Sequence, residues 1–165
     1  MIDRRSLCLV VVALVAPLPA LAHSADDPAA PITAIYDRAS GGGHGGQFVW
    51  VKKGDRARWF SRDLAARWNK ADSKTAKGDQ KPLGFDPVSN SQDPGVRAPR
   101  VTLKSRSANN ALVAVSFVGW GEAPKRQTIL YDMVREKKRW AIDDIRGTID
   151  GKDWSVRALL ASWKG

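Results

Sequence analysis

The sequence predicts an α+β domain in which helices come first and pack on a curved antiparallel sheet of four strands, followed by a short C-terminal helix. Three observations predict this fold class. Apolar residues recur with a helical period before residue 80, and they alternate with a period of two between residues 100 and 147. Short turns separate the alternating segments, and such short connections force neighbouring strands to be antiparallel.

The first 22 residues have the pattern of a signal peptide. Arg4 and Arg5 precede an apolar run over 7–21, which ends in Ala20-Leu21-Ala22, the small-x-small pattern that a signal peptidase cleaves. The run is interrupted by prolines and is shorter than a membrane-spanning helix, which needs about 20 apolar residues. We therefore expect cleavage near Ala22, no membrane span, and a periplasmic or secreted location.

Removal of residues 1–22 leaves 143 of the 165 residues, enough for a single domain with its own core. The only cysteine, Cys8, lies in the removed segment, so the mature chain has no disulfide, thiol nucleophile or cysteine-bound metal. Residues 23–30 are small and polar and are expected to form a flexible leader. The α+β domain is expected over 31–165, without a cofactor.

The first helix is expected over 31–40, because a proline in its first turn is followed by apolar residues at helical spacing. These residues are Ile32, Ile35 and Tyr36. The glycine-rich segment 41–46 ends this helix. In the next segment, 47–60, a short apolar run is compatible with a strand and also with a helix, so both structures stay open.

A second helix is expected over 61–78. Ser61 can cap its first N–H groups, Asp63 lies in the first turn, where the helix dipole favours negative charge, and Gly78 closes the helix. Its buried stripe comprises Phe60, Leu64, Trp68 and Ala71. The following polar corner, 84–95, is dense in Pro, Gly, Asp and Asn, which is typical of a turn.

Four segments with a period of two follow the polar corner and are joined by short turns. We expect strands over 100–107, 111–120, 126–136 and 139–147. The second of these is apolar on both faces, which places it centrally in the sheet. A closing helix is indicated by apolar residues at helical spacing and is capped by Asp153 or Ser155. The apolar residues are Val156, Leu159, Leu160 and Trp163.

Three stretches, GFDPVSNSQD (84–93), TILYDMVREKKRWAIDDI (128–145) and SVRALLASW (155–163), together resemble an uncharacterised family of exported bacterial domains. The resemblance covers about residues 31–163 and implies a cystatin-like, nuclear-transport-factor-like cone. It implies no single activity, because that superfamily holds isomerases, dehydratases, small-molecule binders and interaction modules. The chain departs from the family at Pro94, where an aromatic residue is expected.

The chain is strongly basic, with 27 Lys and Arg against 17 Asp and Glu and a formal net charge of +10. Without Asp3, Arg4 and Arg5 the mature charge is +9. Such a charge concentrates anionic partners, and export argues against nucleic acid among them. An anionic envelope component or an acidic protein is then the expected partner. The alternative is that the charge only keeps the protein soluble.

The polar corner offers four candidate binding residues for a cation or a polar ligand. They are Asp86, Asn90, Gln92 and Asp93. Their spacing does not match a calcium loop, and turn chemistry explains the same residue types. After cleavage near Ala22, His23 and His44 would allow a copper site, but a metal-free leader and loop is the simpler interpretation. We therefore expect no metal.

Cations interleave with aromatic residues in one segment, and a second basic cluster lies at a predicted hairpin tip. Either cluster can dock an anionic partner, while the alternative is solvated charge. The first cluster comprises Trp50, Lys52, Lys53, Arg56, Arg58 and Trp59. The second comprises Arg135, Lys137, Lys138 and Arg139.

A pocket in the cone needs an inward polar group, for which Tyr131 and Asp144 are candidates. If Trp140 and Ile142 are buried, the period of two places Asp144 on their face. An aspartate with a raised pKa there is the basis of an enzyme hypothesis, whereas a satisfied structural carboxylate is the simpler interpretation. We interpret the chain as an exported, non-catalytic binding or interaction domain, with an immunity protein as one version. The alternative is a small-molecule enzyme that uses a single acid.

Overall fold

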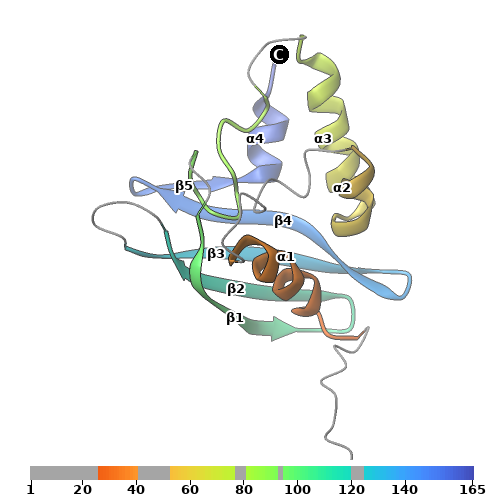
Figure 1. Ribbon diagram of the computed structural model, residues 1–165. Helices are drawn as coiled ribbons and strands as arrows, with labels where there is room; N and C mark the ends of the chain where they lie inside the picture. The colour runs from red at the N-terminus through yellow and green to blue at the C-terminus, as the bar shows by residue number, and fades with distance from the viewer. Residues whose placement is uncertain (1–25, 41–52, 77–80, 93–94, 120–124) are drawn as a thin grey trace, which may run out of the picture.

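The computed structural model describes residues 26–40, 53–76, 81–92, 95–119 and 125–165. These residues form an α+β fold with four helices and a five-stranded antiparallel sheet in the order β1-β2-β3-β4-β5 (Figure 1). The helices are α1 (Ala30–Ser40), α2 (Lys53–Trp59), α3 (Arg62–Lys74) and α4 (Val156–Ser162). The strands are β1 (Arg97–Arg106), β2 (Asn110–Val118), β3 (Arg126–Glu136), β4 (Arg139–Ile149) and β5 (Lys152–Ser155).

The sheet has one strand more than the four that the sequence analysis expected, and those four correspond to β1, β2, β3 and β4. β5 pairs with the end of β4 through a turn at Asp150 and Gly151, whose φ angles are 51° and 75°. An Asp-Gly pair favours a two-residue hairpin turn, because both positions need a positive φ. The Asp150-Gly151 pair is therefore a sequence signal for this hairpin, which the period of two up to residue 147 did not include.

β1 lies at one edge of the five-stranded sheet and is interrupted twice. Its register against β2 shifts within 97–100 and again within 103–105. Ala98 has a φ of 46°, and the next residue, Pro99, has no N–H to donate. Such bulges bend a strand and increase its twist, so β1 forms a kinked edge.

The helices follow local signals in the sequence. The segment that was open between strand and helix is helical over α2, while its first part, 47–52, lies outside the described residues. The side chain of Ser61 accepts the N–H of Leu64 at 3.0 Å and so caps α3, as expected. Ser155 caps α4 in the same way, accepting from Ala158 at 3.2 Å.

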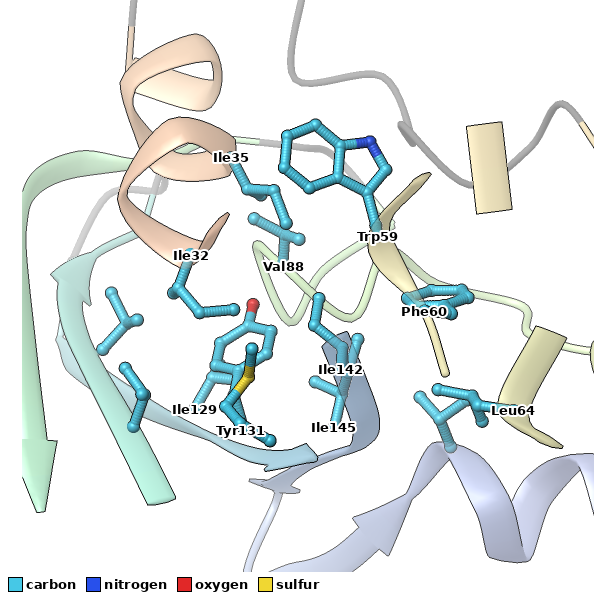
Figure 2. Packing of buried hydrophobic residues seen from close by; sticks show 14 of the residues in the cluster. Ile32, Ile35, Trp59, Phe60, Leu64, Val88, Ile129, Tyr131, Ile142 and Ile145 are labelled. Atoms are coloured by element: carbon cyan, nitrogen blue, oxygen red, sulfur yellow. The ribbon is translucent and has the colours of Figure 1, made fainter. Parts of the chain in front are cut away.

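One face of the sheet, here called the inner face, is packed against α1 and the polar corner (Figure 1). Figure 2 shows Tyr131 in the middle of this cluster, with side chains of α1 on one side and of β4 on the other. The hydroxyl groups of Tyr131 and Tyr36 are 3.0 Å apart, and Tyr36 donates to the carbonyl of Val88 at 2.9 Å. Side chains therefore fill the space between α1 and the sheet. The fully buried strand residues of this face include Val113, Val115, Phe117, Ile129 and Tyr131.

A second group of helices packs beyond β4. Phe60 pairs with Ile142 of β4, and the N–H of Ser61 donates to the carbonyl of Ile142 at 2.8 Å. From this point α3 runs beside α4 (Figure 1). Leu64 of α3 and Leu160 of α4 are buried in the same apolar cluster, which joins the two helices to the main core.

A bulge in β4 changes which face its residues occupy. Met133 pairs with Ile142, but Asp132 pairs with Asp144, so Asp143 is an extra residue on β4. The extra residue moves Asp144 to the face opposite Ile142, here called the outer face. The expectation that Asp144 shares the face of Ile142 is therefore wrong, because the strict period of two does not hold across the bulge.

Candidate functional site

The candidate site is a groove between α3 and α4, here called the α3–α4 groove. Arg67, Lys70 and Lys74 are three and seven positions apart on α3, and therefore lie on one side of the helix. They line a hollow of about 240 Å³, which is closed on the other side by Leu160 and Ala161 of α4. The groove thus has one cationic wall and one apolar wall.

The charge of Arg67 is balanced within the fold. Its Nε lies 2.7 Å from the carboxylate of Asp63, which a second guanidinium, that of Arg157, also contacts at 2.7 Å. Arg157 in turn contacts Asp143 at 2.6 Å. The hydrogen bond from Arg67 has the largest effect on the pKa of Asp63 and, together with the Coulomb attraction of the two arginines, holds it below its usual value against the opposing effect of burial. Two arginines and two aspartates therefore cancel at this end of the groove.

The two lysines supply the net charge of the groove. The ammonium group of Lys74 donates to the carbonyl of Trp163 at 3.2 Å, which orients this side chain without neutralising it. Among the residues that the structure describes, the ammonium group of Lys70 has no partner. Both side chains are exposed, and within the described residues neither ammonium group forms an ion pair, so a bound anion can contact both without displacing a carboxylate.

The helix expected over 61–78 contains all three cationic residues of the groove, but none of them is among the candidate site residues predicted from the sequence. The spacing of Arg67, Lys70 and Lys74 on a predicted helix was a signal for a cationic stripe. The second wall could not be predicted from local spacing, because Leu160 and Ala161 belong to a helix about ninety residues away in the chain.

The polar corner is a self-contained turn around a buried carboxylate. The Oδ1 atom of Asp86 accepts the N–H of Val88 at 3.1 Å, and its Oδ2 accepts both the N–H and the hydroxyl of Ser89 at 3.2 and 2.8 Å. Burial raises the pKa of Asp86 to about 6, against the opposing effect of these hydrogen bonds. Its carboxylate is directed into its own loop.

Asn90 connects the polar corner to the sheet. Its amide group donates to Gln127 of β3 at 2.8 Å and to the carbonyl of Thr148 of β4 at 2.9 Å. Its oxygen accepts the indole N–H of Trp154 of β5 at 2.9 Å. Gln92 is exposed, and Asp93 lies outside the described residues. Of the three candidates that the structure describes, Asp86 is bonded within its own turn, Asn90 is bonded to the sheet and Gln92 is exposed, so they do not share a ligand site.

The aromatic and basic cluster near α2 is partly internal. Trp50 and Lys52 lie outside the described residues, and Lys53 begins α2. Arg56 is only 3% exposed; it forms an ion pair with Asp72 at 2.5 Å and lies over the ring of Trp68. Trp59 is 5% exposed and is flanked by the guanidinium groups of Arg38 and Arg58. Arg56 and Trp59 are thus part of the packing of α2.

The second basic cluster lies at the turn between β3 and β4, as expected. Lys137 and Lys138 are exposed at its tip, where Lys137 has a φ of 57°. Arg139 donates to the carbonyls of Arg58 and Phe60 at 2.9 and 3.0 Å, which fastens the hairpin to α2. Arg135 contacts Asp26 at 2.8 Å and lies over the ring of Trp140. Two of the four cations therefore have structural contacts.

Tyr131 and Asp144 lie on opposite faces of the sheet. Tyr131 is fully buried on the inner face, where desolvation raises its pKa well above the usual value. On the outer face, the carboxylate of Asp144 accepts from the N–H of Ile145 at 2.8 Å, the hydroxyl of Ser155 at 2.6 Å and the N–H of Arg157 at 3.0 Å. Asp144 therefore anchors the start of α4.

Within the described ranges, no three His, Cys, Asp or Glu side chains form a group that can hold a metal ion. The two histidines, His23 and His44, lie outside these ranges. No helix in the described part of the chain is sufficiently long and apolar to cross a membrane. Comparisons with protein-family models, curated proteins and solved structures found no match to this chain.

Proposed function

We propose that the chain is an exported, non-catalytic binding domain whose partner is anionic, either a component of the bacterial envelope or an acidic protein. The observation that carries this proposal is the α3–α4 groove. There Lys70 and Lys74 face a hollow without an acidic partner among the described residues, in a chain of net charge +10. A cationic concave surface raises the local concentration of anions and speeds their capture.

Export and family membership belong to the same proposal. The signal-peptide pattern of residues 1–22 supports export to the periplasm or the medium. The three stretches that resemble the family of exported domains coincide with the polar corner, the hairpin of β3 and β4, and α4. On this basis we also propose the finer form of the fold, a cystatin-like cone in which the sheet curves around α1.

The positions of the two pocket candidates support binding rather than acid–base catalysis. A general acid must come within hydrogen-bond reach of its substrate. Tyr131 is fully buried against Tyr36, and the carboxylate of Asp144 is occupied by three donors. These contacts give both residues a structural role.

Salt-dependent capture of the envelope partner tests this proposal. The mature protein is immobilised and exposed to an envelope extract at low and high salt, and the bound material is quantified. We expect binding to fall steeply as salt rises, because exposed charges are screened within about 8 Å at physiological ionic strength. Capture that does not depend on salt would refute the proposal.

A matched pair of variants locates the interaction. Lys70→Glu/Lys74→Glu changes two charges in the groove, and Lys137→Glu/Lys138→Glu makes the same change at the hairpin tip. We expect the first variant to lose most of the salt-dependent capture and the second to retain it. Equal losses in both variants would show that only the overall charge matters.

A further inference from the structure

The two walls of the α3–α4 groove differ in character, and this difference restricts its occupant. Lys70 and Lys74 are four residues apart on α3, which places them about 6 Å apart along the helix axis at about 1.5 Å per residue. Arg67, three residues before Lys70, lies on the same side of α3, but its charge is balanced by Asp63. The opposite wall is formed by Leu160 and Ala161 of α4, whose side chains are apolar.

An extended polypeptide matches this arrangement. Its side chains alternate in direction, so every second residue points to the same side, at a spacing of about 6.6 Å along the chain. Acidic residues at alternate positions therefore reach Lys70 and Lys74 in turn. The residues between them point toward Leu160 and Ala161 and must be small and apolar.

Two other occupants fit less well. An inorganic phosphate is bound best by donors that converge on one point, whereas these cations form a row. A helix with acidic residues four positions apart also matches the spacing of the lysines, but it turns those residues to one side, whereas an extended chain points alternate side chains toward both walls of the groove.

We propose that the α3–α4 groove binds an extended segment of an acidic protein, with Asp or Glu at alternate positions facing Lys70 and Lys74, and small apolar residues between them facing Leu160 and Ala161. This inference rests on the proposed function, since it specifies the class of the anionic partner. It adds a sequence pattern that net charge alone does not require.

Peptides of equal composition test the pattern. One probe is a short peptide of alternating glutamate and alanine, and the other contains the same residues as a glutamate block followed by an alanine block. We expect the alternating peptide to bind the mature protein more tightly, by about threefold to tenfold, since surface ion pairs are individually weak. Equal binding of both peptides, or tighter binding of the block peptide, would overturn the inference.

Three variants separate charge from shape, and near-ultraviolet circular dichroism checks that each is folded. Lys70→Glu should weaken the alternating peptide by about threefold to tenfold, while Lys152→Glu, the same change at exposed Lys152 of β5, should not. Ala161→Leu fills the hollow without a change of charge and should also weaken this peptide. Equal effects of Lys70→Glu and Lys152→Glu, or no effect of Ala161→Leu, would contradict the inference.

Inorganic phosphate and vesicles that contain phosphatidylglycerol serve as competing anions. If either displaces the alternating peptide at an equal concentration of charge, the groove is not selective for a polypeptide and the inference is wrong. The proposed function then still stands if envelope capture is lost in Lys70→Glu/Lys74→Glu. If that capture is also unaffected, both proposals fail.

Discussion

The hydrogen bonds of Asp86 and its burial have opposite effects on its pKa. The side chain is 1% exposed, and three donors of its own turn contact its carboxylate. These donors favour the charged form, but loss of hydration disfavours it more, which raises the pKa from 3.8 to about 6. The polar corner therefore contains a carboxylate whose charge opposes folding at neutral pH.

The stability of the protein should depend on pH because of Asp86. Because the pKa of Asp86 is higher in the folded than in the unfolded chain, its contribution to stability is full below about pH 4 and is lost as the pH rises through about 6. Acidification from pH 7 to pH 5 should therefore add about 1 kcal/mol from this residue. Urea unfolding of the protein and of Asp86→Asn at both pH values measures the contribution of Asp86 to this change in stability. An identical pH dependence in both proteins would contradict it.

Asn90 combines two requirements in one position. Its φ of 55° is in the left-handed region, which asparagine tolerates better than most residues, and its side chain bonds to three strands. A glycine would satisfy the backbone without the side chain, whereas an alanine would satisfy neither. The two substitutions therefore separate the two contributions.

We expect Asn90→Gly to lower the free energy of unfolding by about 1–3 kcal/mol, because partners such as the half-buried indole N–H of Trp154 lose their acceptor. Asn90→Ala should cost about 1–2 kcal/mol more, because of its positive φ. Chemical denaturation followed by tryptophan fluorescence gives both values. If Asn90→Gly is as stable as the parent protein, the side-chain bonds contribute little.

At the scale of elements, the bulge in β4 joins the sheet to α4. Asp143 and Asp144 both accept hydrogen bonds from Arg157. The guanidinium group of Arg157 donates to the carboxylate of Asp143 at 2.6 Å, and its backbone N–H donates to the carboxylate of Asp144 at 3.0 Å. A regular strand would place these neighbours on opposite faces. The extra residue brings both carboxylates to the start of one helix, and thereby fixes the position of the wall that α4 contributes to the groove.

Two aspartates on the outer face provide a matched test of this connection. Asp144→Ala should destabilise the protein by about 1–3 kcal/mol, because the buried N–H of Ile145 and the half-buried N–H of Arg157 lose their acceptor. Asp132 lies directly opposite Asp144 in the neighbouring strand and forms an ion pair with Arg146, whose side chain is 41% exposed. Asp132→Ala should therefore cost only about 0–1 kcal/mol. Denaturation and hydrogen exchange at α4 measure the difference. Faster exchange at α4 in Asp132→Ala than in Asp144→Ala would contradict this account.

Local patterns predicted most elements, and their failures have local causes. The period of two predicted β3, and its buried residues Ile129, Tyr131 and Met133 alternate along the strand because that strand is regular. In β4, Ile142 and Ile145 are both buried but three residues apart, an odd spacing that signals a bulge. A period of two applied without this observation assigns Asp144 to the wrong face.

At the scale of the whole molecule, composition predicted a cationic surface but not its location. The net charge of +10 is a sum over the chain, whereas the groove depends on the approach of α3 to α4. Several cations that appeared to form a surface cluster in the sequence have internal roles, as Arg56 and Arg139 show. Which cations are available to a partner depends on long-range packing, and no local pattern contains that information.

The kinked edge of β1 has a consequence for the behaviour of the protein at high concentration. A second copy that tried to extend the sheet would meet two breaks in register and a proline without an amide proton, so it could form no continuous ladder. The positive charges along the same strand, Arg97, Arg100, Lys104 and Arg106, would also repel an identical strand. Self-association of the domain through its β1 edge is therefore disfavoured, even at high protein concentration.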